Sequence, residues 1–133
     1  MPAVPVPPEL DALLALPNPA VVGTVSPDGR PHTAATWYDW EDGRALLNMD
    51  ESRLRLGYLR KNPNVSLTIL ADGDWYRHVT LTGRVVSIEE DVGLRDIDRL
   101  SMRYVGEPYA NRERRRFTAW VQPERWHSWP MPR

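Results

Sequence analysis

The sequence of 133 residues contains no cysteine. This absence excludes disulfides, thiolate zinc sites and catalytic thiols. The three histidines, His32, His78 and His127, lie in separate segments without the spacing of a metal site, so no metal centre is expected. Ser52 has no neighbouring histidine in a familiar catalytic motif. We therefore assign no catalytic residue.

Charge of one sign and long apolar runs are scarce as well. Basic residues number 17 and acidic residues 18, which leaves a net charge of −1. Such a chain has no global field that attracts nucleic acid or an acidic membrane surface. No apolar run is long enough to span a bilayer, and the N-terminal residues lack the pattern of a secretion signal. We expect a soluble, cytoplasmic protein that binds no nucleic acid and spans no membrane.

Phenylalanine occurs once, whereas tryptophan occurs six times and tyrosine five times. Trp and Tyr suit ligand-stacking walls and subunit interfaces, although they also fill cores and cover barrel ends. Many of the 13 prolines lie in residues 2–8 and 123–132, which predicts extended tails. The length predicts a single domain over residues 1–133, with a proline-rich tail at each end.

Alternating apolar residues and turn sequences predict six strands. The turn sequences SPDG at residues 26–29 and EDG at residues 41–43 each join two strands. Gly83 is expected to form a bulge or bend in a long strand, as barrel closure requires. The expected strands cover residues 19–25, 30–40, 44–49, 65–70, 75–88 and 117–122.

Three short helices are expected around these strands. Residues 9–16 favour a helix that Pro17 ends. A second helix follows Ser52, which is predicted as its N-cap. Residues 94–105 carry an amphipathic stripe that ends at Gly106. The pattern predicts the α+β class and a six-stranded antiparallel β-barrel with short peripheral helices.

Arg53 and Arg55 form the strongest candidate site that the residues themselves indicate. The first N–H groups of a helix lack partners and carry the positive end of its dipole. Two guanidinium groups beside them predict a phosphate site, provided that Arg53 precedes the helix, since residues two apart on a helix diverge. The alternative is a solvated, arginine-rich helix. In residues 30–40, Ala34, Ala35 and Thr36 leave room for a flat group.

Several short motifs occur in order along nearly the whole chain. In this order they resemble the split-barrel flavin-binding superfamily that includes pyridoxamine 5′-phosphate oxidase, and in particular its branch of small actinobacterial enzymes that use the deazaflavin coenzyme F420. The motifs are VVGTV (21–25), PDGRPH (27–32), WY (37–38), DGR (42–44), LRKNPNV (59–65), GRV (83–85), RYVGEPY (103–109) and VQPERW (121–126).

The resemblance implies an FMN-binding split barrel that forms a homodimer, with cofactor in grooves that both chains line. In the family pattern, the phosphate is bound by a basic residue eight positions before the proline of Asn-Pro, often with an arginine two positions earlier. Counting from Pro63 gives Arg55 and Arg53. Lysine is usual where Arg55 stands, so F420 and FMN both stay open.

The resemblance also implies a set of cofactor-binding residues. For Trp126, the alternative is an aromatic residue at the dimer interface or the barrel end. The set consists of Thr33, Ala34, Ala35, Thr36 and Trp37 along the ring system, Asn48, Met49 and Asp50 beside the ring and ribityl chain, Ser52, Arg53 and Arg55 at the phosphate, and Trp126 as a cover from the other subunit.

The implied function is a reductase that moves a hydride from reduced F420 to a small, conjugated acceptor. A lack of catalytic side chains does not oppose this function, because the cofactor carries the hydride chemistry. One alternative is a non-catalytic F420- or FMN-binding carrier. Another, an FMN-dependent pyridoxamine phosphate oxidase, is disfavoured because no second phosphate site is visible. The arginine-rich residues 112–116 fit either a solvated loop or a site for a polyglutamate tail on F420.

Overall fold

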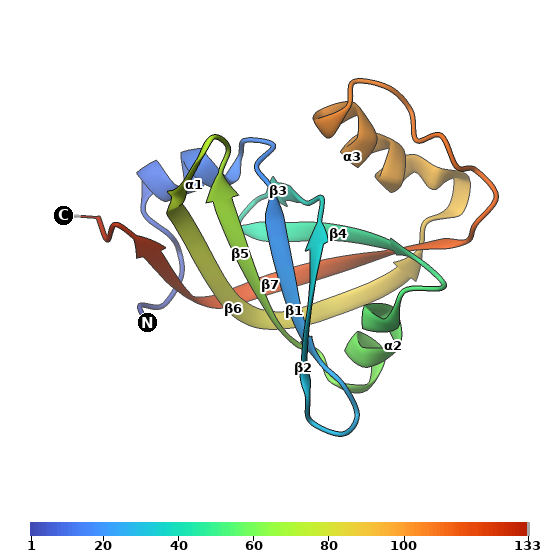
Figure 1. The fold of residues 1–133 in the computed structure, drawn as a ribbon, viewed down its shortest axis with the longest axis horizontal. Helices are drawn as coiled ribbons and strands as arrows, with labels where there is room; N and C mark the ends of the chain where they lie inside the picture. The colour runs from blue at the N-terminus through green and yellow to red at the C-terminus, as the bar shows by residue number, and fades with distance from the viewer. Residues whose placement is uncertain (133) are drawn as a thin grey trace.

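The computed structural model describes residues 1–132 as a strongly curved antiparallel sheet with three helices at its margins (Figure 1). The strand order is β2-β1-β5-β6-β7-β4-β3. The strands are β1 (Ala20–Val25), β2 (Pro31–Thr36), β3 (Asp39–Glu41), β4 (Arg44–Asp50), β5 (Asn64–Ala71), β6 (Asp74–Glu90) and β7 (Arg116–Trp129). The helices are α1 (Pro8–Leu14), α2 (Leu54–Lys61) and α3 (Arg95–Tyr104), with a 3-10 turn η1 (Val92–Leu94) before α3.

The expected α+β class and antiparallel barrel architecture are confirmed, with seven strands in place of six. Residues 30–40, expected as one strand, divide into β2 and β3. The division lies at Tyr38, which is 0% exposed and whose hydroxyl donates to the carbonyls of Leu14 and Leu16 at 2.7 and 3.0 Å. Burial of this side chain beside α1 interrupts the strand.

The last strand is longer than expected, because residues 123–129 belong to β7 and are not a free tail. β6 has 17 residues and pairs with β7 as far as Trp129. The N-terminal segment lies beside this extension: the Trp126 N–H donates to the carbonyl of Pro2 at 3.0 Å. The long partner strand therefore determines where β7 ends.

Gly83 marks the irregularity predicted for it. The register of β6 against β7 shifts between Thr82 and Gly83, where Gly83 lies opposite Pro123. A Cβ atom on Gly83 would overlap the carbonyl oxygen of Gln122 and lie 2.8 Å from the Cα of Pro123. The bend therefore depends on a close backbone contact that only glycine permits.

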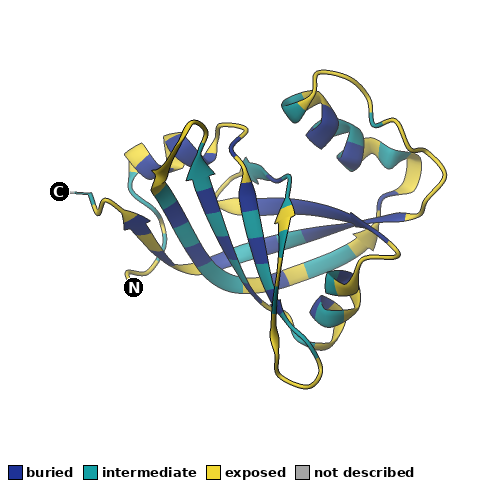
Figure 2. Cartoon of the chain, in the orientation of Figure 1, coloured by how far each residue is buried: buried dark blue, intermediate teal, exposed yellow. Residues whose placement is uncertain are grey.

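β4 is buried along most of its length (Figure 2), and its successive residues belong to two apolar clusters. Leu47 and Met49 belong to the main core inside the curved sheet. Leu46 packs with Ile97 and Leu100 of α3 in a second, smaller cluster. All residues of β4 after Arg44 are buried for this reason. The second cluster holds α3 beside β4, and this arrangement positions the site described next.

No helix within residues 1–132 has the length and apolar composition needed to span a bilayer. The longest, α3, has ten residues.

Candidate ligand-binding site

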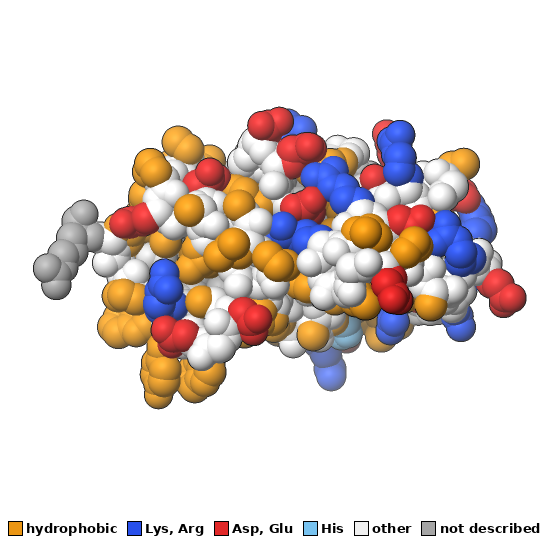
Figure 3. Space-filling view, turned by 90° about the horizontal axis from the view of Figure 1, so that it is seen from above, with side chains coloured by type: hydrophobic (Ala, Val, Ile, Leu, Met, Phe, Trp, Pro, Cys, Tyr) orange, Lys and Arg blue, Asp and Glu red, His pale blue; other side chains and the backbone are white. Residues whose placement is uncertain are grey.

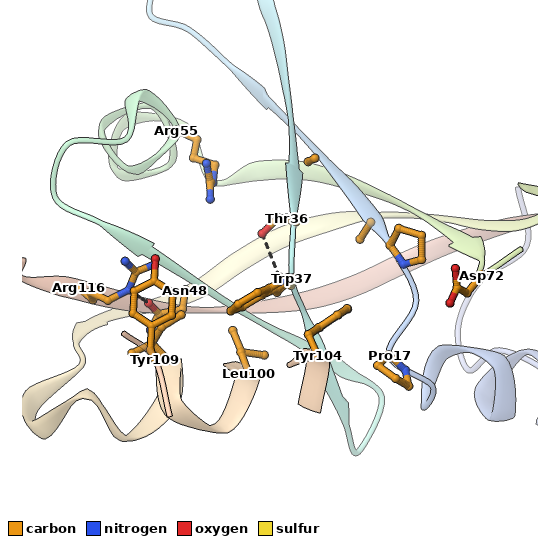
Figure 4. Close-up of a pocket in the computed structure, with 14 residues that line it drawn as sticks. Pro17, Thr36, Trp37, Asn48, Arg55, Asp72, Leu100, Tyr104, Tyr109 and Arg116 are labelled. Atoms are coloured by element: carbon orange, nitrogen blue, oxygen red, sulfur yellow. Dashed lines mark hydrogen bonds between the residues drawn. The ribbon is translucent and has the colours of Figure 1, made fainter. Parts of the chain in front are cut away.

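A cleft of about 580 Å³ lies between β2, β4, α2 and α3 (Figure 4). One wall is aromatic and apolar, and two arginines from different elements face the cavity. Within the described residues 1–132, no group of three His, Cys, Asp or Glu side chains is arranged to hold a metal ion. The cleft is lined by Pro17, Pro19, Ala20, Ala35, Thr36, Trp37, Asn48, Arg55, Asp72, Ile97, Leu100, Tyr104, Tyr109 and Arg116.

The structure brings five of the expected site residues together in this cleft and places the others around or outside it. Ala35, Thr36, Trp37, Asn48 and Arg55 line the cavity. Asp50 is buried beside it, and Ser52 and Arg53 lie exposed in the turn before α2.

The remaining four expected residues lie away from this cleft. Thr33 lines a separate cleft farther along β2, together with residues of β1, β5 and β6. Ala34 packs against the main core, and Met49 is part of that core, because neighbours along a strand point to opposite faces. Trp126 is buried in the core of its own chain, where its indole N–H donates to the carbonyl of Ala3 at 3.2 Å. A role for Trp126 over a partner's cofactor stays a prediction.

The expectation that Ser52 caps α2 is wrong. The helix begins at Leu54, its N-cap is Arg53 in an extended conformation, and no side chain caps it. The Ser52 hydroxyl donates instead to the Asp50 carboxylate, and the Ser52 N–H donates to the same oxygen at 2.8 Å. These two bonds hold Ser52 beside Asp50 at the end of β4. The helix α2 therefore starts at Leu54, one residue later than it would with Ser52 as its N-cap. Arg53 consequently precedes the helix, which is the condition for both arginines to reach one anion.

Four guanidinium groups lie near the buried carboxylate of Asp50. Nε of Arg53 lies 3.4 Å from its Oδ2, and Nη1 atoms of Arg114 and Arg116 lie 3.9 Å from its oxygens. Arg55 is close enough for its pKa to respond to Asp50. Basic side chains are also frequent on the half of the surface away from the C-terminus (Figure 3). One carboxylate does not neutralise four cations, so this corner of the cleft favours an anion.

Arg55 is the least compensated of these cations. Its Nε is buried and has no hydrogen-bond partner among residues 1–132. Burial and, secondarily, the charge of Arg53 lower the pKa of Arg55. A buried donor without a partner costs free energy, and an anionic ligand would supply the missing acceptor. Figure 4 shows the Arg55 guanidinium pointing from α2 into the cleft.

The aromatic wall is held in place from several sides. The rings of Trp37 and Tyr104 stack with centroids 5.4 Å apart and 7° between their planes, and Tyr109 meets Trp37 edge-on. The Tyr104 hydroxyl donates to the carbonyl of Asn18 at 2.7 Å. Arg103 donates to the carbonyls of Ala15, Leu16 and Tyr38 at 2.8, 2.6 and 3.0 Å. The wall is therefore rigid and flat, which suits a planar ring system.

The sequence analysis did not identify Arg116 and Tyr109 as site residues. Arg116 belongs to the arginine-rich residues 112–116, which the structure divides into two groups. Arg112 and Arg115 form exposed ion pairs with Asp98 and Glu90 at 2.8 and 2.7 Å, whereas Arg116 is only 7% exposed. Extending the expected strand 117–122 by one residue would have placed Arg116 on the same face as Thr118, but nothing in the local sequence links Arg116 to Asn48.

The charge of Asp50 is expected to stabilise the fold near neutral pH. Burial opposes its ionisation, but hydrogen bonds from Ser52 and the charges of Arg53 and Arg116 outweigh burial and lower the pKa of Asp50. A lowered pKa gives stability that is present above the unfolded-state value of about 4 and is lost as the pH falls through the folded-state value. Asp50→Asn should therefore unfold at lower urea concentration at pH 7, and its difference from the native protein should shrink below about pH 4. Urea titrations at pH 7, 5, 4 and 3 measure this difference, and a difference independent of pH would contradict the assignment.

Residues 6–130 match the family model of pyridoxamine 5′-phosphate oxidase. None of the curated proteins matches the chain. Among solved structures, one named F420 Reductase has a TM-score of 0.82 and 26% sequence identity, covering 92% of this chain and 98% of its own. The conserved hypothetical protein Rv2991 from Mycobacterium tuberculosis has a TM-score of 0.73 and 28% identity, covering 95% of this chain and 85% of its own.

General Stress Protein 26 from Bacillus anthracis has a TM-score of 0.64 and 20% identity, covering 88% of each chain, and this likeness concerns the fold. The family match extends over most of the sequence, and the similar structures cover nearly the whole barrel. The split-barrel architecture is therefore shared, and the chain belongs to the pyridoxamine 5′-phosphate oxidase family.

Proposed function

We propose that the protein is an oxidoreductase that binds coenzyme F420 in the cleft and transfers a hydride from its reduced form to a small, planar, conjugated acceptor. The observation that carries this proposal is the unpaired, buried Nε of Arg55 at the cleft. Membership of the family and likeness to a protein named F420 Reductase support it.

The residues of the cleft fit the binding of such a cofactor. Arg55 and Arg53 would hold its phosphate, because guanidinium forks bind phosphate oxygens and both stand at the start of α2. Ala35 and Thr36 leave space beside the aromatic wall of Trp37 for a flat ring. The bound deazaflavin would supply the hydride, whereas the chain's residues bind, orient and shield it. The remaining expected contacts, from Thr33 to Trp126, stay predictions.

FMN is the alternative cofactor, favoured by the family to which the chain belongs. It carries a phosphate and a planar ring as well, so the same residues would serve it. The second candidate function is a carrier that binds F420 or FMN without turnover.

We also propose that the protein is a homodimer. Two neighbouring exposed aromatic residues support it: the rings of Trp75 and Tyr76 stack on the surface, 63% and 64% exposed. Such residues are enriched where subunits meet. The cytoplasmic location expected from the sequence stays a prediction.

Titration of the cofactor-free protein with F420 and, separately, with FMN tests the proposal. Trp37 lines the cleft, so binding should quench tryptophan fluorescence, and Trp37→Phe should remove much of that signal. Micromolar or tighter binding of F420, with turnover of a conjugated acceptor, supports the reductase. Binding without turnover of any acceptor supports the carrier. Preference for FMN moves the protein to the flavin-dependent members, and binding of neither refutes the proposal.

A further inference from the structure

We propose that Arg116 is a second anion-binding residue of the cleft, that Asn48 and Asp91 are its positioning residues, and that Arg55 and Arg116 together hold one oxyanion. This inference rests on the proposed function only in using the same cleft. It concerns the side of the cleft formed by β4, β7 and α3, where the residues expected at the cofactor were Asn48, Met49 and Asp50 of β4.

Arg116 is held by a neutral side chain. Its Nε donates to Oδ1 of Asn48 at 2.7 Å, and both side chains are buried. The Nδ2 group of Asn48 donates to the Asp91 carboxylate at 3.1 Å and to the Thr118 hydroxyl at 3.2 Å. These contacts fix which way the Asn48 amide faces, because only its carbonyl oxygen can accept from Arg116.

Asp91 is in turn fixed by the start of α3. Its two carboxylate oxygens accept the N–H groups of Asp96 and Ile97 at 3.0 and 2.9 Å. The Asp91 N–H donates to the carbonyl of Arg116 at 2.8 Å. Asp91 therefore links the helix that forms one wall of the cleft to the arginine that enters it.

This arrangement orients Arg116 without neutralising it. The amide of Asn48 stands between the guanidinium and Asp91, so the two opposite charges do not meet. The carboxylate of Asp50 lies 3.9 Å from Nη1 of Arg116 and also contacts Arg53 and Arg114. The Arg116 guanidinium lies 4.7 Å from the centroid of the Tyr109 ring. Burying a cation with so few opposite charges nearby destabilises the folded protein, and a bound anion would offset this loss of free energy.

Arg55 and Arg116 approach the same space from different elements. Figure 4 shows Arg55 entering from α2 and Arg116 lying beside Asn48 across the cavity. After burial and the charge of Arg53, the charge of Arg116 also lowers the pKa of Arg55, so the two cations repel each other. An oxyanion between them would accept hydrogen bonds from both and remove that repulsion. The chemistry fits a phosphate group with two negative charges better than a single carboxylate.

The test uses the full chain and inorganic pyrophosphate, followed by the ¹H–¹⁵N signals of the arginine Nε–H groups. In the native protein, pyrophosphate should shift the signals of both Arg55 and Arg116. Arg116→Gln should weaken pyrophosphate binding about tenfold or more, the scale of one charge-assisted contact. Arg115→Gln is the matched control, since Arg115 is exposed and paired with Glu90, and its affinity should stay within about twofold of the native value.

Two further variants test the positioning residues. Asn48→Asp places a carboxylate against Arg116, which should abolish the response of the Arg116 signal to pyrophosphate. Asp91→Asn replaces one of the two carboxylate oxygens by an NH₂ group, so the side chain can no longer accept from Asn48, Asp96 and Ile97 together. It should leave Arg116 charged but speed the solvent exchange of its Nε–H, and addition of pyrophosphate should slow that exchange again. A purely structural role of Asp91 would lower stability without changing this exchange.

The outcomes separate this inference from the proposed function. If F420 or FMN binds but the Arg116 signal does not move and Arg116→Gln binds equally well, the inference is overturned and the function stands. If neither cofactor binds but pyrophosphate shifts both arginine signals, the inference stands and the function is refuted. If pyrophosphate shifts only Arg55, the inference is overturned. Whether pyrophosphate shifts one or both arginine signals is measured on the native protein, so this outcome can be observed even if a variant does not fold.

Discussion

Replacement of Arg55 by alanine is expected to weaken cofactor binding by about 1.5 to 3 kcal/mol, or about 10- to 150-fold, while the fold stays intact. The reason lies in the position of the side chain. Arg55 stands in the first turn of α2, and its buried Nε has no partner within residues 1–132. Its removal deletes an anion contact without breaking a hydrogen bond in the free protein.

Fluorescence titration of the variant with F420 and FMN measures this loss, and thermal unfolding of the cofactor-free variant checks the fold. Lys61→Ala is the matched control, because Lys61 is an exposed cation at the other end of the same helix. The control should bind as the native protein does. Equal affinities of Arg55→Ala and the native protein would exclude Arg55 from the site.

Replacement of Gly83 by alanine is expected to destabilise the protein by about 3 kcal/mol, at the upper end of the usual cost of overpacking. The added methyl group would overlap the backbone of Gln122 and Pro123. Backbone atoms in a paired strand cannot rotate away as a side chain can. The two long strands would have to separate at the bend that curves the sheet.

Urea denaturation measures the cost as a lower midpoint with an unchanged slope. Gly23→Ala is the control, because its Cβ would meet only the hydroxyl oxygen of Ser66, at 2.5 Å. That hydroxyl can turn to another rotamer, so the control should lose less than about 1 kcal/mol. If both variants unfold at the same urea concentration, the close backbone contact does not determine how much stability the added methyl group at Gly83 costs.

Local sequence patterns were sufficient to predict much of the fold. The turn sequences at residues 26–29 and 41–43, the amphipathic stripe that became α3 and the glycine at the bend, Gly83, are all visible in the local sequence, although the contact that requires Gly83 lies across the β6–β7 pair. Such features follow from backbone preferences and periodicity, which can be read without knowledge of distant contacts. The antiparallel class followed from them.

The errors in the fold have long-range causes. The break between β2 and β3 depends on Tyr38 reaching the carbonyls at the end of α1, which lie more than twenty residues earlier. The extent of β7 depends on the length of β6. Neither contact can be recognised from the local sequence. Residues 30–40 were therefore predicted as one strand and residues 123–129 as a tail.

The candidate site was predicted only in part, because some of its contacts are also between residues far apart in the sequence. Helix-end chemistry and the family resemblance pointed to Arg55, and the resemblance pointed to residues 33–37, of which Ala35, Thr36 and Trp37 line the cleft. Met49 was included although alternation along β4 directs it away from Asn48 and into the core. Arg116 was missed because its neighbours in sequence are solvated, whereas its partner Asn48 is 68 residues away.

The contacts of Arg103 have a consequence for ligand entry. Through three backbone carbonyls, this side chain joins the end of α3 to the segment after α1 and to the break between β2 and β3. These three charge-assisted bonds hold the end of α3 against both segments and oppose an outward swing of the helix. A ligand meets a wall that is already ordered, so most of the entropy lost on association is the ligand's own. Association should then proceed in a single kinetic phase whose rate rises linearly with ligand concentration.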